Sequence, residues 1–417
     1  MTPDVIIIGG GAAGMMAAVA AADRGQQVLL LEKMNQAGLK LRITGKGRCN
    51  LTNTAPLKDF LTHVGSDGRF LRNCMSRFYN QELMDFFSQR GVPLVEERGK
   101  RVFPQSGKSL DIFLALINDL EHRPNVEIRK NCAVRNIETT LDTDGVKLVS
   151  GVRLQSGETI SAQRVILATG GLSYPLTGAT GAGYRWAAEL GHTVIPPVPS
   201  LVALRCSQTV PRELEGFVLK NVALRIRQAD GKPIFDQQGE MTFFEDGISG
   251  PIVLSASRIV SRTLHNGTPL EALVDLKPAI TAEVLDHRLI NDLNANGTRI
   301  FNDALRLWMP AELIPFALTH LHIEYYKRLN QINGNERKRL LAFLKGMPLT
   351  LTGTHDFNEA ITTQGGVCLN EINPKTMESK LVKGLHIVGE VLDLDADTGG
   401  YNLQIAFSTG WTAGNAS

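Results

Sequence analysis

The opening of the chain constrains the fold more than any other stretch. An apolar run from Asp4 to Ile8 leads directly into Gly9-Gly10-Gly11-Ala12-Ala13-Gly14, which has the G-x-G-x-x-G spacing. An alanine-rich stretch follows, and a second apolar run, Val28–Leu31, ends at Glu32. A strand, a glycine turn, a helix, a strand and an acidic residue in this order are typical of a dinucleotide-binding βαβ unit. The sequence therefore predicts a Rossmann-like domain that begins at the first strand.

Each part of this unit has a physical role. Gly9 allows the tight turn, Gly11 lets the backbone approach a pyrophosphate, and Gly14 lets the helix pack closely on the strand. The helix begins with N–H groups that have no partner within the helix, and with the positive end of its dipole, so a phosphate is favoured there. Glu32 is placed to accept hydrogen bonds from ribose hydroxyls, which favours a ribose without a 2′-phosphate.

The composition excludes several classes of protein. The 417 residues suffice for two or three domains, and 43% hydrophobic with 21% charged residues is ordinary for a globular enzyme. The formal net charge of +2 gives no support for a nucleic-acid partner or an anionic membrane surface. The 5 cysteines form no C-x-x-C pair, which argues against a disulfide framework, a zinc site or an iron–sulfur cluster. We expect a cytoplasmic protein without a metal site.

One stretch of the opening unit could be mistaken for a targeting segment. The residues from Val5 to Ala22 are uncharged and mostly apolar, and by length they could pass for a signal peptide or a membrane span. No basic residue precedes them, and Asp4 and Asp23 flank them. Their glycines fit a strand, a turn and a helix better, so we expect no targeting signal and no membrane association.

The residues after the opening unit continue the alternation of helices and strands. The spacing of apolar residues predicts helices over residues 69–92 and 110–120, and a meander of short strands over 126–162. A fully apolar strand at 164–168 then runs into Thr169-Gly170-Gly171. This second strand-to-glycine junction is a further candidate for contact with a cofactor.

The chain changes character near the prolines at 196–199, where short strands begin, and near Ala279, where leucine spacing predicts helices. A strand at Leu385–Val388 then runs into Gly389-Glu390, so we expect both ends of the chain to build one sheet. The predicted fold class is α/β, a Rossmann-like dinucleotide-binding domain built from both chain ends with an inserted β-barrel-like domain and a helical subdomain. The predicted boundaries are 1–195 and 366–417 for the two parts of the Rossmann-like domain, 196–278 for the inserted β domain, 279–346 for the helical subdomain and 347–365 for the return segment of the insert.

A loop rich in glycine and basic residues follows Glu32. It begins at Gly38, carries Lys40, Arg42, Lys46 and Arg48, and ends in Cys49-Asn50-Leu51-Thr52-Asn53. We expect this loop to wrap the cofactor, with cations near the pyrophosphate and backbone amides near the ring. The alternative is a solvated basic loop.

Several stretches together resemble known flavoproteins. They are Gly9–Gly14 with Glu32, Gly45–Asn53, Ala168–Gly171, and Gly389-Glu390 with Thr398–Gln404; the turn Gly247–Pro251 also matches. The chain is similar to the two-dinucleotide-binding-domain flavoproteins of the glutathione-reductase superfamily. More narrowly, it resembles a bacterial FAD oxidoreductase family that includes aminoacetone oxidase and a bile-acid enone reductase. That family usually has Thr-His before the GISGP-like turn, where Phe244-Glu245-Asp246 stands here. The resemblance therefore does not carry substrate identity.

The resemblance implies FAD as the cofactor and a contact for each stretch. The glycine turn and Thr169-Gly170 would meet the diphosphate, Glu32 the ribose, and the backbone of Ala133 and Val134 the adenine. A helix that starts near Asn402 would point its N–H groups at the flavin N1/C2=O edge, where negative charge grows on reduction. The implied cofactor-binding residues are Gly9, Gly11, Ala12, Ala13, Gly14, Glu32, Lys33, Lys40, Arg48, Cys49, Asn50, Ala133, Val134, Thr169, Gly170, Gly171, Gly389, Glu390, Gly400, Tyr401, Asn402 and Leu403.

Two features have both a functional and a structural interpretation. Cys49 lacks the second nearby cysteine that the disulfide reductases of this superfamily use, so a structural thiol is favoured. Asp393, Asp395 and Asp397 alternate, but no calcium-loop pattern completes them. Solvated or N-capping carboxylates are therefore favoured over a metal site.

No catalytic residue can be named from the sequence. Tyr174 and Tyr401 fit a place over the flavin, or a proton donor, as well as they fit half-buried structural tyrosines. His386 alternates within a buried strand and is interpreted as a core residue.

The sequence predicts an FAD-dependent oxidoreductase that acts on a small molecule. In one version NAD(P)H reduces the flavin, and an alkene conjugated to a carbonyl is then reduced; in the other an amine-type donor reduces the flavin and oxygen accepts the electrons. A non-catalytic FAD-binding sensor and an RNA-modifying flavoprotein are the remaining alternatives. No second G-x-G-x-x-G unit is present for a dedicated NAD(P)H domain. The oligomeric state is open.

Overall fold

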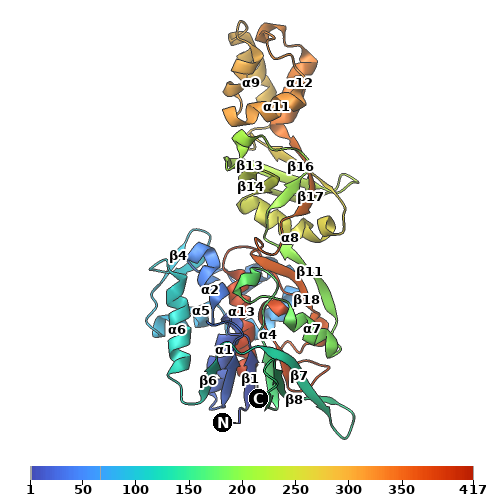
Figure 1. The fold of residues 1–417 in the computed structure, drawn as a ribbon. Coiled ribbons are helices and arrows are strands. Elements are labelled where there is room, and N and C mark those ends of the chain that lie inside the picture. Colours follow the sequence, from blue (N-terminus) through green and yellow to red (C-terminus); the bar gives the residue numbers. More distant parts are fainter. Residues whose placement is uncertain (1, 66, 417) are drawn as a thin grey trace. The chain divides into compact units, whose positions relative to one another are not determined.

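The computed structural model describes residues 2–65 and 67–416, and it divides into two compact units (Figure 1). The first unit contains Met1–Ser200 and Phe357–Ser417, so it is built from both ends of the chain. The second unit is the intervening segment, Leu201–Asp356. The finer division into five segments stays a prediction.

Five parallel strands form the central sheet of the first unit, in the order β19-β10-β1-β2-β6. Ile7 of β1 lies opposite Ile166 of β10 on one side and Leu30 of β2 on the other. Wholly apolar strands such as β1 and β2 are buried along their length, as in sheets covered on both faces. The Rossmann-like domain built from both chain ends is therefore confirmed. The strands are β1 (Val5–Ile8), β2 (Val28–Leu31), β6 (Val126–Arg129), β10 (Arg164–Leu167) and β19 (Leu385–Ile387).

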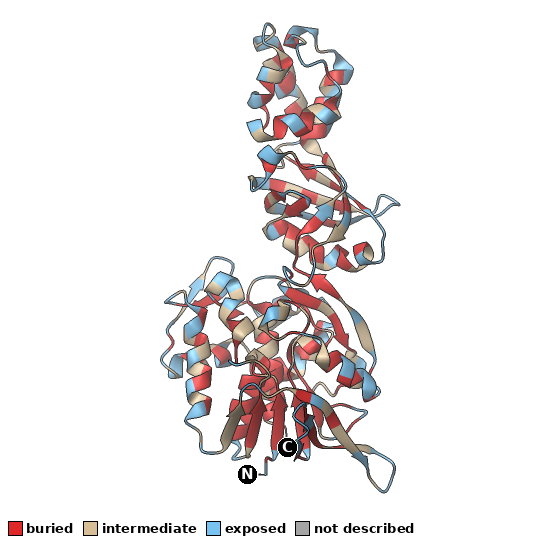
Figure 2. Ribbon diagram, in the orientation of Figure 1, coloured by how far each residue is buried: buried red, intermediate tan, exposed pale blue. Residues whose placement is uncertain are grey.

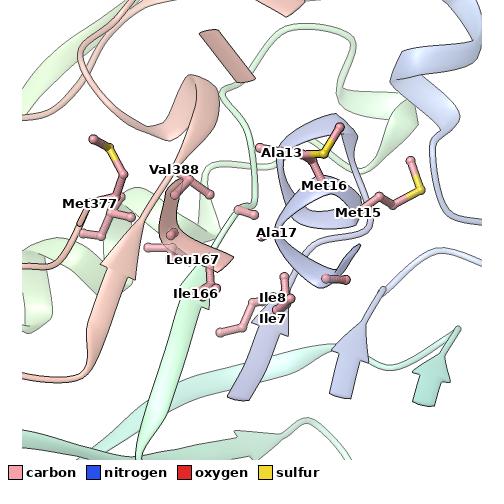
Figure 3. Close-up of a cluster of buried hydrophobic side chains, with 14 of the residues drawn as sticks. Ile7, Ile8, Ala13, Met15, Met16, Ala17, Ile166, Leu167, Met377 and Val388 are labelled. Atoms are coloured by element: carbon pink, nitrogen blue, oxygen red, sulfur yellow. The ribbon is translucent and has the colours of Figure 1, made fainter. Parts of the chain in front are cut away.

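Helix α1 (Ala12–Asp23) follows β1 and packs against α13 (Tyr401–Gly414). A Cβ atom at Gly410 would overlap the backbone oxygen of Ala13, and one at Gly414 would overlap that of Ala17. The two helices therefore touch through their backbones. Figure 3 shows the buried side chains of α1 gathered with those of β1, β10 and the segment at Val388.

Smaller sheets and further helices complete the first unit. The sheets have the orders β3-β5-β4, β7-β8-β9 and β11-β18. Their strands are β3 (Thr52–Asn53), β4 (Leu94–Glu97), β5 (Arg101–Pro104), β7 (Val134–Leu141), β8 (Lys147–Leu154), β9 (Thr159–Ser161), β11 (Val194–Ser200) and β18 (Thr362–Val367). The helices are α2 (Leu39–Ile43), α3 (Leu57–Thr62), α4 (Arg72–Met75), α5 (Asn80–Gln89), α6 (Ser109–Glu121) and α7 (Ala182–Glu189). Short 3₁₀ turns are η1 (Thr44–Gly47), η2 (Gly68–Leu71), η3 (Pro175–Thr177), η8 (Leu369–Glu371) and η9 (Gly389–Val391).

The second unit contains a closed barrel with the strand order β12-β15-β14-β13-β16-β17. Large apolar side chains such as Leu224, Phe243 and Val274 are fully buried in its core. Helix α8 (Pro251–His265) packs against β14 and β17. The predicted inserted β-barrel-like domain is therefore confirmed. Its strands are β12 (Leu204–Cys206), β13 (Val218–Arg227), β14 (Pro233–Phe244), β15 (Gly247–Ser249), β16 (Leu270–Asp275) and β17 (Met347–Thr354).

The helical subdomain of the second unit is also confirmed. Its leucine-rich faces are buried, with Leu289, Phe301 and Leu340 fully enclosed. Figure 2 shows the buried residues concentrated along the central strands of the first unit and between the elements of the second. The helices are α9 (Ala282–Ala295), α10 (Phe301–Ala304), α11 (Ile314–Leu321) and α12 (Gly334–Lys345), with 3₁₀ turns η4 (Arg212–Leu214), η5 (Leu305–Leu307), η6 (Ala311–Leu313) and η7 (Leu329–Gln331) in this unit.

The predicted helix over residues 69–92 is interrupted. The segment contains η2, α4 and α5 in succession, and residues 76–79 separate the last two. The backbone N–H of Tyr79 donates to Glu82 Oε2 at 2.9 Å, and this capping contact starts a new helix at Asn80. Apolar spacing does not reveal such a break, because the aromatic residues on both sides enter the same core.

Two other expectations were wrong in detail. The strand at 126–129 does not belong to the meander, because Val126 pairs with Val28 in the parallel sheet. Residues 251–265, expected within the run of short strands, form α8. Pro251 stands at the first position of that helix, and Ile252, Ala256 and Val260 recur at helical spacing on its buried face. The β-branched residues of this segment obscured the helical period.

Candidate functional site

The carboxyl ends of four central strands carry the predicted cofactor residues. β1 leads to Gly9–Gly14, β2 to Glu32, β10 to Thr169–Gly171 and β19 to Gly389-Glu390. Because neighbouring strands are parallel, these ends lie along one edge of the sheet. Ligands of open α/β sheets bind at this edge. The structure thus brings together segments from both ends of the chain.

The turn between β1 and α1 is shaped by its glycines. Gly9 has φ +108°, and a Cβ atom there would lie 2.5 Å from the backbone oxygen of Ala168. A Cβ at Gly14 would overlap the oxygen of Gly9, whereas one at Gly11 would meet no heavy atom within 4 Å. α1 has no side-chain cap, so its first N–H groups face the open space beside Gly11. The turn can therefore accept an anion such as a diphosphate.

Glu32 is held in place by the backbone. Its Oε2 accepts a hydrogen bond from the N–H of Gly10 at 2.8 Å, and its Oε1 accepts one from the N–H of Met34 at 2.8 Å. A carboxylate has further lone pairs, which can accept from the hydroxyls of a ribose. Cys132 donates its N–H to the backbone oxygen of Glu32 at 2.8 Å, so the structure places the following residues, Ala133 and Val134, beside this site.

Lys33 contacts the glycine-rich segment before α7. Its Nζ donates to Thr180 Oγ1 at 2.7 Å, and burial lowers the pKa of Lys33 although the charge of Glu32 acts in the opposite direction. Gly170 has φ +72° and open space around its Cα, whereas a Cβ at Gly171 would overlap the side chain of Thr363. The segment after β10 therefore has one open and one tightly packed glycine.

Lys40 and Glu390 form the centre of a polar network. Lys40 Nζ lies 2.6 Å from Glu390 Oε2 and 2.5 Å from Ser173 Oγ. Glu390 Oε1 accepts from the N–H of Thr363 at 2.8 Å and from Ser173 Oγ at 3.0 Å. Only about a quarter of each charged side chain is exposed (26% and 21%), so the pair is partly shielded from water. Four separate segments of the first unit are joined by this network.

Residues 48–50 occupy three different environments. Arg48 extends to the edge of the small sheet, where its guanidinium lies 2.5 Å from Glu97 Oε1 and 4.4 Å from the ring centre of Phe103. Cys49 is fully buried with φ +58°, and burial raises the pKa of its thiol to about 12. The thiol is therefore protonated at neutral pH and is no thiolate nucleophile. Asn50 Oδ1 is buried and has no hydrogen-bond partner among the described residues.

The N-terminus of α13 is uncapped. Gly399 and Gly400 have φ of +135° and +96°, and a Cβ at Gly400 would overlap the backbone oxygen of Thr52. Asn402 does not cap the helix, because its side chain bonds both the N–H and the carbonyl of Ala396, at 2.9 and 2.8 Å. No side chain satisfies the first N–H groups of the helix. They are therefore free to meet a group that carries negative charge.

These features fit FAD. The two uncapped helix ends belong to α1 and α13, which are packed against each other, so both can face one extended ligand. Thr169 Oγ1 is, like Asn50 Oδ1, buried without a hydrogen-bond partner among the described residues. Buried polar atoms in native proteins are nearly always satisfied, so both atoms can take a hydrogen bond from a bound ligand.

Several residues of this region carried no signal in the sequence. Ser173 and Thr363 join the network around Glu390. His63 Nδ1 lies 2.8 Å from Asp397 Oδ2, and the ring of His63 stacks on Tyr401 with centroids 4.5 Å apart and an interplanar angle of 23°. The partners in these contacts are far apart in the chain, so no local motif could have identified them.

The expectation for the alternating aspartates was wrong for one of them. Asp395 is buried, with 2% of its surface exposed, and its Oδ2 accepts from Ser200 Oγ at 3.2 Å. It is not a solvated carboxylate, because the backbone around it is drawn into the first unit by pairing between Val64 and Ala396. Within residues 2–65 and 67–416, no group of three or more His, Cys, Asp or Glu side chains is arranged to hold a metal ion.

Tyr401, Tyr174 and His386 differ in their surroundings. Tyr401 is buried edge-on against Phe60, with centroids 4.8 Å apart, and burial raises the pKa of its phenol. Tyr174 is half-buried with φ +55°, and burial raises its pKa too. His386 is a core residue, as predicted: its Nδ1 lies 2.9 Å from the carbonyl of Thr376, and burial lowers its pKa to about 4.

The sequence has relatives over nearly its whole length. Residues 3–416 match the model of the HI0933-like protein Rossmann domain. The chain is 34% identical to a 3-dehydro-bile acid delta(4,6)-reductase of Clostridium scindens, over 95% of this chain and 93% of that protein. It is 30% identical to a ribosomal RNA dihydrouridine synthase of Escherichia coli K12, over 93% of this chain and 91% of that protein.

A solved structure shares the fold. The 3-ketosteroid delta1-dehydrogenase of Sterolibacterium denitrificans, in complex with 1,4-androstadiene-3,17-dione, superimposes with a TM-score of 0.50 over 99% of both chains. At 13% sequence identity this likeness shows the fold alone. Among the described residues, no helix has the length and apolar character needed to cross a membrane.

Proposed function

The chain belongs to the HI0933-like Rossmann-domain family of FAD-dependent oxidoreductases, and we propose that it reduces a carbon–carbon double bond conjugated to a carbonyl group. One observation carries the proposal: two relatives with unrelated substrates have names that describe the same bond change. A delta(4,6)-reductase of a 3-dehydro steroid acts on a carbonyl-conjugated alkene. A dihydrouridine synthase saturates the C5=C6 bond of uracil, which is conjugated to the C4 carbonyl.

The proposed FAD site extends along the sheet edge described above. The diphosphate would lie on the first N–H groups of α1 and beside Gly170, and the ribose would donate its hydroxyls to Glu32. Bound FAD supplies hydride transfer at its N5 atom. The N–H groups at the start of α13 would stabilise negative charge at the pyrimidine edge of the ring, and Asn50 Oδ1 would accept a hydrogen bond from it.

The network around Glu390 would orient the cofactor. Lys40 binds Oε2 of the Glu390 carboxylate, and the Thr363 N–H and the Ser173 hydroxyl both donate to its Oε1. An arrangement with this many partners has little rotational freedom, so it can present Lys40 and Ser173 to the ligand in one geometry. Arg48 is engaged with Glu97 at the small sheet, and its contact with the cofactor stays a prediction.

NAD(P)H is the proposed electron donor. The first test is a visible spectrum of the purified protein, followed by anaerobic addition of NADH and NADPH. We expect a bound-flavin spectrum that bleaches with one of the two nucleotides and returns when a steroidal 3-oxo-4,6-diene or a simple cyclic enone is added. Return of the spectrum with oxygen alone, after reduction by an amine, would instead support the amine-type oxidase. Membership in an oxidoreductase family sets aside the non-catalytic alternative.

A uridine of ribosomal RNA is the second candidate substrate. Two observations favour it: the relatives that are ribosomal RNA dihydrouridine synthases, and an exposed aromatic pair in the second unit. Tyr325 and Tyr326 expose 44% and 73% of their surfaces, and their ring centres lie 4.9 Å apart. Exposed aromatic rings can stack on unpaired bases.

The RNA candidate has its own test. Purified ribosomal RNA would be incubated with the reduced enzyme, digested to nucleosides and analysed by mass spectrometry for a gain of two hydrogens on uridine. The variant Tyr325→Ala/Tyr326→Ala should then lose most of the RNA product while its bleaching by NAD(P)H is unchanged. Formation of enone product without any dihydrouridine would assign the enzyme to small molecules.

A further inference from the structure

A histidine, an aspartate and a tyrosine form a cluster beside the N-terminus of α13. His63 lies just after α3, and 41% of its side chain is exposed. Its Nδ1 is 2.8 Å from Asp397 Oδ2, so this nitrogen carries the proton of the hydrogen bond and Nε2 points away from the carboxylate. The aromatic face of Tyr401 supports the imidazole ring. The imidazole therefore has a fixed orientation with one nitrogen directed outward.

The backbone already joins the two segments that carry this pair. The N–H of Asp397 donates to the carbonyl of His63 at 3.0 Å, and the N–H of Gly65 donates to the carbonyl of Asp395 at 2.7 Å. Val64 and Ala396 form an antiparallel bridge between these bonds. These backbone bonds hold the two segments together, so His63 and Asp397 face each other from a fixed backbone.

The pair of His63 and Asp397 lies beside the start of α13. Tyr401 is the first residue of α13, and its ring lies directly under His63. Asn53 ties the glycines before this helix to the loop after Glu32, because its Nδ2 donates to the carbonyl of Gly399 at 3.0 Å. His63 is thus attached to the helix end that we assign to the pyrimidine edge of the flavin. With the flavin edge at this helix end, the imidazole would border the place of the substrate.

We propose that His63 is the acid that protonates the substrate, with Asp397 as its positioning residue; this proposal rests on the function proposed above. Reduction of the conjugated alkene needs one hydride and one proton. Bound FAD in its reduced form would supply the hydride, with both electrons, for the new C–H bond at the β-carbon. The π electrons of the alkene form the bond between the α-carbon and the proton on His63 Nε2. His63 leaves this step neutral and regains a proton from water.

Other acids of the region are less suited to this step. Tyr401 is buried under the imidazole, and its raised pKa disfavours release of the phenolic proton. Lys40 is committed to Glu390 and Ser173. The thiol of Cys49 is fully enclosed. An arrangement in which a carboxylate orients one imidazole nitrogen and leaves the other for proton transfer is a recurrent solution in enzymes.

The kinetic test separates the two half-reactions of the holoenzyme. In His63→Asn, bleaching of the flavin by NAD(P)H should stay within about twofold of wild type, whereas reoxidation by the enone should slow by about 10²–10⁴-fold. Asp397→Asn should slow the same step less. His122→Asn is the matched control, because His122 is also exposed and its Nδ1 contacts the carbonyl of Asn118, four residues earlier in the chain. Wild-type reoxidation rates in His63→Asn and in Asp397→Asn would overturn the proposal.

A rescue experiment distinguishes proton transfer from a structural role. Added imidazole should restore reoxidation of His63→Ala by at least about tenfold and leave wild type unchanged. A loss of thermal stability with no rescue would show that His63 only supports the loop. If the wild-type protein reduces no enone and no uridine, the proposed function fails, and this outcome is distinct from an active wild type with an equally active His63 variant.

A third measurement does not depend on turnover. Diethyl pyrocarbonate would be used to label the histidines of the holoenzyme and of the full-length chain stripped of FAD, with peptide mass spectrometry as the readout. His63 should label at least about fivefold more slowly when FAD is bound, whereas His122 should label equally in both forms. Equal labelling of His63 in the two forms would place it away from the cofactor and would overturn the proposal.

Discussion

The cores of the two units are packed in opposite ways. In the first unit, α1 is built largely of alanine and glycine, and it meets α13 with almost no side chain between the two backbones. In the second unit, the barrel is filled by large side chains such as Phe243 and Leu224. The cofactor-binding unit thus depends on residues that are small, whereas the inserted unit depends on residues that are large. The comparison teaches that the two units are sensitive to opposite changes in side-chain size. The first unit is sensitive to added atoms, and the second unit is sensitive to lost atoms.

The largest expected effect is in the barrel. Phe243→Ala should lower the free energy of unfolding of the second unit by about 3–5 kcal/mol, because a fully buried ring is replaced by a cavity. Urea unfolding followed by hydrogen exchange of peptides from each unit would measure it. The first unit should keep its flavin absorbance at urea concentrations that unfold the second unit. Simultaneous loss of both would show that the units do not unfold independently.

The opposite substitution tests the first unit. Gly410→Ala adds one methyl group that would overlap the backbone oxygen of Ala13, so we expect a loss of about 1–3 kcal/mol and weaker retention of FAD. Gly334→Ala is the matched control, because Gly334 lies in a helix of the second unit and a Cβ there meets nothing within 4 Å. This variant should be neutral or more stable by about 0.5–1 kcal/mol. Equal effects of the two substitutions would contradict the comparison.

The polar network should show a smaller effect that is confined to the first unit. Lys40→Met leaves the Glu390 carboxylate without its cation, and we expect a loss of about 1–2 kcal/mol in the free energy of FAD binding. A second substitution, Glu390→Gln, should cost less in the Lys40→Met background than in wild type, because the two groups are coupled. Fluorescence titration of the stripped protein with FAD measures both. Additive losses would show that the ion pair does not act as a unit.

The last expected effect depends on pH and develops only below about pH 6.5. His192 and His386, both in the first unit, have pKa values that burial lowers, that of His386 to about 4 from an ordinary value of 6.5. Between about pH 4 and pH 6.5, His386 binds a proton in the unfolded chain that it does not bind in the folded chain. The stability of the first unit should therefore fall as the pH drops from about 6.5 towards 4, by at most about 1.4 kcal/mol per pH unit for each histidine.

A variant of His386 gives the control for this pH dependence. In His386→Asn the amide can still donate to the carbonyl of Thr376, but it does not titrate. The urea midpoint of the first unit should then depend less steeply on pH than in wild type. The urea midpoint of the second unit should have the same pH dependence in the variant and in wild type. An unchanged slope in the variant would assign the acid sensitivity to other groups.

Some errors of sequence interpretation have a common cause. The strand at 126–129 was assigned to its neighbours in the chain, but it pairs with β2 of the central sheet. The helix over 251–265 was hidden by β-branched residues, and the buried Asp395 by the acidic character of its surroundings. In each case tertiary contacts outweighed a local preference, as they commonly do for short elements.

The sequence alone determined the Rossmann-like domain, the inserted barrel and the family. Glycine spacing reveals the Rossmann-like domain and the family, because a tight turn or a close backbone contact leaves only one residue type possible at that position. The inserted barrel is indicated instead by its run of short strands. Only the tertiary structure decided that Lys40 meets Glu390 and Ser173, that Thr363 bonds Glu390, and that His63 meets Asp397. Such contacts join side chains of ordinary type across long stretches of chain. Their geometry arises from the folding of the whole unit, and no local pattern encodes it.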